Sequence, residues 1–143
     1  VKIALLITIL PEQPWILILL SLVSRWVLVD LAFRYPYAGK PGSLGGSIIE
    51  QIGLLEFWVA SISTLLATAF TMALGVVFFR QTWLLVSIFA IVTWVFTALV
   101  ARLVANNAVK KIDGITGDIL GAALEISEVM VLFVGTIFTR ILG

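Results

Sequence analysis

The chain of 143 residues contains no cysteine and no histidine, and only 12% of its residues are charged. Without cysteine there are no disulfides, no iron–sulfur clusters held by thiolates and no thiol nucleophile. Without histidine the commonest general base and the commonest transition-metal ligand are missing. Any metal would therefore be bound through oxygen atoms, which suits Mg²⁺, Mn²⁺ or Ca²⁺.

Apolar residues, in contrast, make up 62% of the chain and give it a mean hydropathy of +1.19. A soluble domain is about 45–50% apolar and about 25% charged. The polar surface is too small to cover a water-soluble globule, so the composition predicts a membrane protein with the lipid bilayer as a partner. The net charge of +1 provides no broad basic field, and no nucleic-acid partner is expected.

Four apolar runs are each long enough to cross a bilayer, which takes about 20 residues as a helix. They lie at 15–33, 54–79, 83–105 and 119–142. None alternates apolar with polar residues as barrel strands do, and a helix satisfies its own backbone hydrogen bonds. The sequence therefore predicts an all-α fold, a polytopic transmembrane helical bundle with four full spans plus a partial N-terminal helix.

The N-terminal stretch VKIALLITIL covers about half of a span and has neither a charged leader region nor a small-residue cleavage site. We interpret it as the end of a helix. Residues 1–143 are accordingly predicted to form a single transmembrane helical domain, the C-terminal portion of a longer protein.

Three loops join the spans, at 34–53, 80–82 and 106–118. Four crossings put the first and third loops on one side of the membrane. Five basic residues fall on that side and two on the other: Arg34, Lys40, Arg102, Lys110 and Lys111 against Arg80 and Arg140. Because cytoplasmic loops carry the excess of Lys and Arg, loops 34–53 and 106–118 are predicted to be cytoplasmic, in a multi-pass protein of the cell membrane.

The fourth run carries three carboxylates in its first half. Asp118 is predicted to cap the helix N-terminus. Seven residues later Glu125 returns to within about 20° of the same direction, and Glu128 falls about 80° away. Gly121 and Ala122 lie between these acids, where small residues allow another backbone or a ligand to approach closely.

Ionisable residues at such depth face a cavity or a partner. Two interpretations of the acids have equal weight. In one, Asp118, Glu125 and Glu128 supply oxygen ligands for Mg²⁺ in a cleft open to the cytoplasm. In the other, they form ion pairs with Arg25 or Arg102 and only hold helices together.

The first run contains Arg25 at its middle, followed by Asp30 and Arg34. Asp30 and Arg34 are four residues apart and are predicted to pair along the helix. Arg25 has no acid on its own face, so its partner must come from another helix or a ligand, and its planar fork suits phosphate or carboxylate. Glu56 and Arg102 lie near the ends of their runs, where side chains reach toward the interface.

Two loop segments are candidates for binding a ligand. Arg34 begins a stretch of two phenols and a glycine-rich turn that would fold over a phosphate or a flat ligand: Tyr35, Tyr37, Gly42 and Gly45. The alternative is that the rings only anchor the loop at the membrane surface. In the other loop, Thr116 and Gly117 precede a helix N-terminus, whose free N–H groups attract anions.

ITGDILGAALEISE at 115–128 resembles the C-terminal signature of the cobalamin-5′-phosphate synthases (adenosylcobinamide-GDP ribazoletransferases). That signature reads G-G-x-T-G-D-x-L-G-A, followed by two glutamates. The segment 24–45 resembles the same family's internal motif, S-R followed by R-x-P-Y-A and a glycine-containing turn. Asp113 stands where the family has glycine. The family's acidic motif D-G-x-A-D-x-x-D-G is absent from these residues, so the chain alone is expected to lack a complete active site.

The resemblance implies a Mg²⁺-dependent membrane transferase that joins adenosylcobinamide-GDP to α-ribazole 5′-phosphate and releases GMP, working with an N-terminal segment and compatible with an oligomer. It also implies roles for individual residues. The catalytic set is Asp118, Glu125 and Arg25, and the metal ligands are Asp118, Glu125 and Glu128. The substrate-binding set is Arg34, Tyr35, Tyr37, Gly42, Gly45, Thr116 and Gly117.

Three other functions fit charges within membrane helices. The chain would be a subunit of an ion or small-molecule transporter if the charges line a pathway. It would be a CDP-alcohol phosphotransferase-like enzyme if a D-G-x-x-A-R pattern preceded it. It would be a structural subunit if the charges only join helices.

Overall fold

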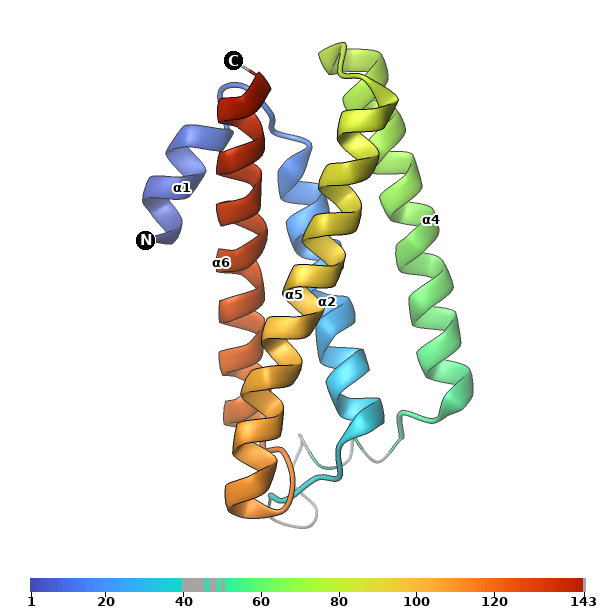
Figure 1. The fold of residues 1–143 in the computed structure, drawn as a ribbon. Helices are drawn as coiled ribbons and strands as arrows, with labels where there is room; N and C mark the ends of the chain where they lie inside the picture. The colour runs from blue at the N-terminus through green and yellow to red at the C-terminus, as the bar shows by residue number, and fades with distance from the viewer. Residues whose placement is uncertain (40–45, 47–48, 50, 143) are drawn as a thin grey trace.

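A computed structural model of the chain describes residues 1–39, 46, 49 and 51–142. It contains the helices α1 (Lys2–Ile9), α2 (Ile16–Arg34), α4 (Leu54–Phe79), α5 (Trp83–Ile112) and α6 (Gly117–Leu142). The four long helices run lengthwise beside one another, and the short α1 lies outside α6 (Figure 1). The predicted all-α bundle with a partial N-terminal helix is confirmed.

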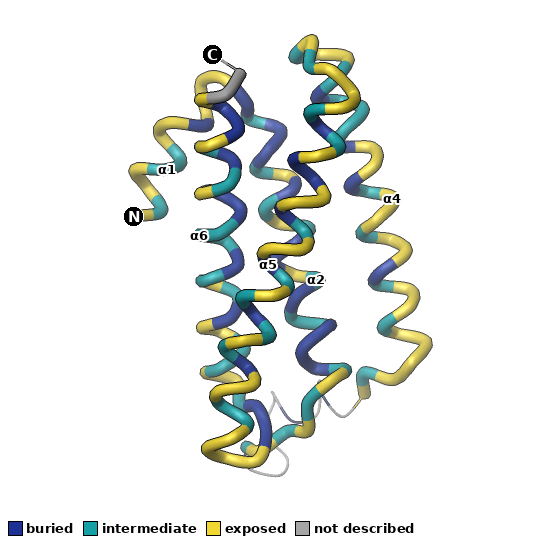
Figure 2. The backbone as a smooth tube through the Cα atoms, in the orientation of Figure 1, coloured by how far each residue is buried: buried dark blue, intermediate teal, exposed yellow. Residues whose placement is uncertain are grey.

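The four long helices are apolar enough to cross a membrane, with mean hydropathies from 1.8 to 2.5. Many residues of α4 are exposed (Figure 2), and the outer faces of the long helices carry large apolar side chains. Leu66 is 68% exposed and Phe78 is 71% exposed. Such a surface is stable against lipid and unfavourable in water, because exposing apolar area to water costs free energy. The chain is therefore a multi-pass membrane protein.

The third span differs from its predicted end at residue 105, because α5 continues through residues 106–112. Lys110 and Lys111 occupy its last turn, where positive charge complements the helix dipole. Asp113 then takes left-handed dihedrals (φ 57°, ψ 22°) and donates its backbone N–H to the carbonyl of Val109 at 2.8 Å. Only residues 113–116 separate α5 from α6, so most of the predicted loop is helix.

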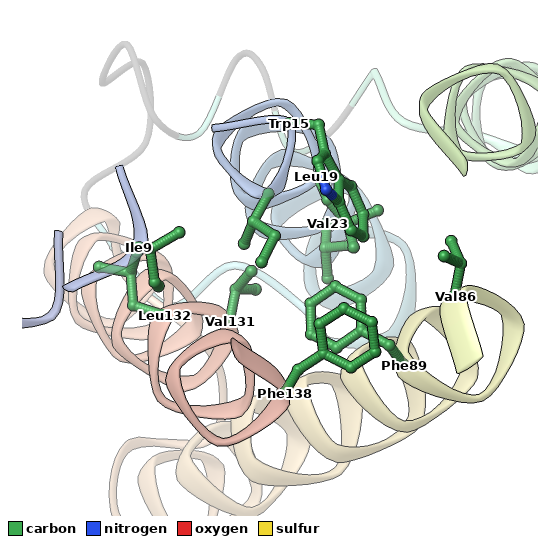
Figure 3. Packing of buried hydrophobic residues seen from close by; sticks show 10 residues of the cluster. Ile9, Trp15, Leu19, Val23, Val86, Phe89, Val131, Leu132 and Phe138 are labelled. Carbon is green, nitrogen blue, oxygen red and sulfur yellow. The ribbon is translucent and has the colours of Figure 1, made fainter. Parts of the chain in front are cut away.

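The end of the bundle that carries the α4–α5 turn is packed by aromatic side chains. The ring of Trp15 meets those of Phe89 and Phe138 edge-on, at centroid distances of 5.6 and 6.2 Å, and these two rings stack at 4.5 Å (Figure 3). Edge-on and offset arrangements are favourable for aromatic rings beyond the area they bury. This cluster fixes α2, α5 and α6 relative to one another.

The opposite half of the bundle is packed by small residues from α2, α5 and α6. They are Ala32, Ala101, Ala105 and Ala123, which are all at least 93% buried. Small side chains let membrane helices approach closely. The close approach brings the α2 C-terminus, the end of α5 and the start of α6 together, at the end of the bundle opposite the α4–α5 turn (Figure 1). The described parts of the two predicted loops thus lie at one end of the bundle, as their predicted common side of the membrane requires.

Candidate functional site

The two loop segments that carry the sequence motifs are paired by backbone hydrogen bonds. Ile115 donates its N–H to the carbonyl of Pro36 at 2.8 Å, and Ala38 donates to the carbonyl of Ile115 at 2.9 Å. Tyr37 and Ile115 thus form a parallel bridge, and Ile115 is fully buried beneath it. We call residues 34–39 and 113–118 together the paired loops.

Two local features allow this pairing. Tyr35 precedes a proline, which favours extended backbone, and it ends α2 with φ −119° and ψ 139°. Gly114 lies so close to the other segment that an added Cβ would be 2.6 Å from the Pro36 carbonyl oxygen and 2.8 Å from the Ala38 Cβ. A side chain at position 114 would separate the paired loops.

The left-handed backbone of Asp113 explains its departure from the family pattern. Its φ of 57° is one of two positive values among the non-glycine residues that the structure describes. Glycine adopts this conformation without strain, and aspartate is among the few other residues that tolerate it. Position 113 therefore requires a residue that tolerates the left-handed conformation, and both glycine and aspartate meet this requirement.

The start of α6 differs from its prediction as well. The helix begins at Gly117, and the hydroxyl of Thr116 accepts the N–H of Ile119 at 3.5 Å. Thr116 is thus the capping residue, and Asp118 lies inside the first turn with an exposed side chain. A carboxylate there still interacts favourably with the positive end of the helix dipole. Asp118 was predicted at the cap because Thr116 was assigned to the preceding loop.

The side chains of Tyr35 and Tyr37 lie along the paired loops. The Tyr35 hydroxyl donates to Oδ1 of Asn106 on α5 at 2.6 Å, tying the end of α2 to α5. The ring of Tyr37 covers Gly39, where an added Cβ would be 2.2 Å from the phenol oxygen. Of the predicted pocket, Gly42 and Gly45 lie outside the residues that the structure describes.

A buried carboxylate holds two guanidinium groups beside the paired loops. Asp30 is 1% exposed and accepts from Nε of Arg34 at 2.8 Å, as the spacing of four predicted. It also accepts from Nε and Nη2 of Arg102 on α5, at 2.8 and 2.9 Å. Two arginines and one aspartate leave this group with a net charge of +1.

Arg102 was predicted only to reach toward the interface, and the structure adds a partner for it, the buried Asp30. Sequence distance hid its role, since Asp30 lies 72 residues away. Glu56 likewise has a defined partner, because its carboxylate accepts the N–H of Gly53 at 2.9 Å and closes the first turn of α4. The feature of the sequence that could have predicted a partner for Arg102 is its charge within an apolar run.

Glu125 and Glu128 converge on one cation, the ammonium group of Lys2. Its Nζ lies 2.6 Å from Oε2 of Glu125 and 2.5 Å from Oε2 of Glu128. These hydrogen bonds, that of Glu125 foremost, raise the pKa of Lys2 above its ordinary value of 10.5. The two glutamates share a flank of α6 as predicted, but their ion-pair partner is Lys2 and not Arg25 or Arg102.

Glu125 and Glu128 could supply some, but not all, of the ligands of a bound Mg²⁺ ion. Their carboxylate oxygens meet a single positive group, and oxygen ligands suit Mg²⁺. Within the described part of the chain, however, no three acidic side chains gather as metal ligands. Asp118 does not join the two glutamates, so these residues supply at most two ligands.

Arg25 remains a predicted ligand-binding residue. It lies at the middle of α2 with an exposed side chain. It is nine residues from the end of α2, about 13 Å at 1.5 Å per residue, and Glu125 is about 12 Å from the start of α6. The two residues therefore lie at similar depth on packed helices.

Four spanning helices whose connections pair at one end, next to buried and half-buried charges, define a polytopic membrane protein with a polar site at that end. The family model described as cobalamin-5-phosphate synthase matches residues 1–136. The chain belongs to this family, whose members act in cobalamin synthesis. This assignment disfavours the transporter, CDP-alcohol phosphotransferase and structural-subunit interpretations.

Curated relatives agree with the family assignment. The adenosylcobinamide-GDP ribazoletransferase of Chlorobium phaeovibrioides is 37% identical over 119 residues, which are 82% of this chain and 43% of that protein. Those of Chlorobaculum parvum and Desulforamulus reducens are 32% and 30% identical, and the matches cover 42% and 41% of their lengths. The match thus spans about two fifths of these relatives. No solved structure matches the chain.

Proposed function

We propose that this chain forms the C-terminal part of an adenosylcobinamide-GDP ribazoletransferase, which joins adenosylcobinamide-GDP to α-ribazole 5′-phosphate and releases GMP. The observation that carries the proposal is the pairing of the two family motifs: Pro36 and Ala38 of one exchange hydrogen bonds with Ile115 of the other. The paired loops lie at the end predicted to be cytoplasmic, where soluble nucleotide substrates are found.

The reaction needs positioning and charge neutralisation more than covalent help from the protein. A ribose hydroxyl of α-ribazole 5′-phosphate attacks the cobinamide-bearing phosphorus of the diphosphate. A new phosphorus–oxygen bond forms, the bond to GMP breaks, and the hydroxyl proton leaves. Negative charge grows on the phosphoryl oxygens throughout, and fixed guanidinium groups stabilise it.

Arg34 is suited to this role. Asp30 engages its Nε, while its side chain is 43% exposed at the start of the paired loops. A guanidinium group held in this way offers a planar fork that suits a phosphate. Tyr35, Tyr37, Thr116 and Gly117 belong to the same paired loops and are proposed to bind substrate there. Arg25 is proposed to contact phosphate deeper in the bundle.

The proposed metal is Mg²⁺, which would neutralise diphosphate charge when bound. Glu125 and Glu128 would hold it in the place where Lys2 now lies. Asp118, exposed in the first turn of α6, would act apart from this metal, at the entrance of the site. Further ligands would come from a segment outside this chain.

A chimera tests the proposal. The N-terminal half of the C. phaeovibrioides relative is joined to this chain, placed in vesicles, and assayed for GMP release from adenosylcobinamide-GDP with α-ribazole 5′-phosphate. We expect release that depends on both substrates and falls about a hundredfold in Arg34→Gln, as for loss of one transition-state donor. A folded chimera that binds neither substrate and releases no GMP would contradict the proposal.

A further inference from the structure

Two grooves open beside α5, one between α5 and α4 and the other between α5 and α2. The first has a volume of about 430 Å³ and lies between the two helices, lined by Leu65, Ala69, Met72, Ala90 and Ile91. The second has a volume of about 240 Å³ and is lined by Trp26, Ala98, Leu99 and Arg102. Trp94 and Val95 line both. The two grooves therefore adjoin at these residues, and we call them together the α4–α5 groove.

The groove is apolar along its length and charged at one end. Its indole donor is satisfied, because Nε1 of Trp94 lies 3.4 Å from the Thr68 hydroxyl. Arg102 closes the end nearer the paired loops, and its side chain is 33% exposed. Two of its nitrogens bind Asp30, while Nη1 has no acceptor within the described part of the chain.

A charge that opens onto a groove inside a membrane span needs an anionic partner. Asp30 does not neutralise it fully, because Asp30 is shared with Arg34 and the three groups sum to +1. The charge therefore remains available to an anion that arrives along the groove.

The dimensions of the groove suit a lipid. From Ser87 to Arg102 it follows 15 residues of α5, about 22 Å, whereas one leaflet of the hydrocarbon core is about 15 Å thick. Arg102 lies one helical turn before Asn106, so its guanidinium reaches toward the headgroup level. α4 and α5 diverge from their common turn toward the loop end (Figure 1), and there Trp26 of α2 lines the groove opposite α5.

We propose that the α4–α5 groove binds one anionic phospholipid of the leaflet at the loop end. One acyl chain lies along Ala90 and Trp94, and the phosphate binds Arg102. The lipid fills the space between the diverging helices and neutralises the excess charge of the group around Asp30. A soluble phosphate would bind Arg102 but leave the apolar groove empty. An anionic lipid matches both the charge and the apolar groove. This binding site is separate from the proposed transfer reaction and does not depend on it.

The test compares lipids retained by the purified chain. The protein is incubated with vesicles of equal amounts of phosphatidylcholine and phosphatidylglycerol with identical acyl chains, extracted in mild detergent, and weighed by native mass spectrometry. We expect one tightly retained lipid per chain and about a fivefold preference for phosphatidylglycerol, as one interfacial arginine provides. Arg102→Gln should remove the preference.

Two further variants separate the groove from the rest of the lipid-facing surface. Ala69→Trp fills the groove and should abolish retention of both lipids. Leu66→Trp places the same side chain on the same helix outside the groove, 68% exposed in the parent, and should change nothing. This pair keeps the test decisive if Arg102→Gln fails to fold.

Three results would overturn the proposal. The first is equal retention of the two lipids by the parent chain. The second is unchanged retention in Ala69→Trp. The third is a lipid-free dimer whose contact is lost in Ala69→Trp, which would mean that a second copy occupies the groove.

Discussion

Asp30 and Arg102 form a two-point contact between α2 and α5, with the carboxylate oxygens 2.8 and 2.9 Å from Nε and Nη2. The aspartate is almost fully buried, whereas the guanidinium is one-third exposed. The same carboxylate also binds Arg34. Asp30 thus orients two guanidinium groups next to the paired loops. Substitutions of these residues should have coupled effects on stability.

Asp30→Asn should destabilise the chain by about 1–3 kcal/mol, because both arginines lose a charged partner but keep some contact with water. Thermal unfolding in detergent measures the change. Combining it with Arg102→Met should cost less than the sum of the single variants, since the unpaired guanidinium is removed. Strict additivity would show that Asp30 and Arg102 do not interact in the folded protein.

Gly114→Ala should weaken the pairing of the loops, because the new methyl group would clash with the carbonyl oxygen of Pro36 and with Ala38. We expect a loss of about 1–3 kcal/mol, the usual cost of overpacking, and faster hydrogen exchange at the Ile115 amide. Gly121→Ala is the matched control: no atom lies within 4 Å of its added Cβ. It should instead stabilise α6 by about 0.5–1 kcal/mol. Equal effects at both positions would contradict the close approach at Gly114.

Asp113 tests whether backbone conformation or charge matters at the end of α5. Asp113→Gly should leave stability unchanged or raise it by up to about 1 kcal/mol, because glycine relieves the left-handed strain. Asp113→Val should lower it by about 1–2 kcal/mol. Asp113→Asn removes the charge and keeps tolerance of that conformation, so it should resemble the parent. Chemical unfolding measures all three, and a large loss in Asp113→Asn would point to the charge.

The contact of Lys2 with Glu125 and Glu128 predicts a pH dependence. The pKa of Lys2 is raised in the folded chain, so its contribution is complete below 10.5 and is lost as the pH rises through the folded value. Spin labels on cysteines introduced at Ile7 of α1 and Ile137 of α6 should show a broader distance distribution above that pH.

The absence of native cysteine makes this labelling specific. Lys2→Gln is the control, and its distance distribution should already be broad at neutral pH and insensitive to further alkali. A parent chain whose distribution stays narrow well above pH 10.5 would show that other contacts hold α1 on α6.

The parts of the site that depend on local helix geometry could be predicted from the sequence. The Asp30–Arg34 pair followed from a spacing of four residues, and the common flank of Glu125 and Glu128 followed from helix periodicity. The helix ends near Thr116 and Asn106 were misjudged, because polar residues near a membrane surface fit both a loop and a helix that extends beyond the apolar run.

The sequence by itself determined the four spanning helices, because a chain in lipid must satisfy its backbone within each segment and hydropathy is a local property. Only the tertiary structure decided that Arg102 meets Asp30, that Lys2 lies between Glu125 and Glu128, and that Pro36 pairs with Ile115. These contacts join residues 72 or more positions apart. They depend on the order and rotation of packed helices, which no single segment specifies.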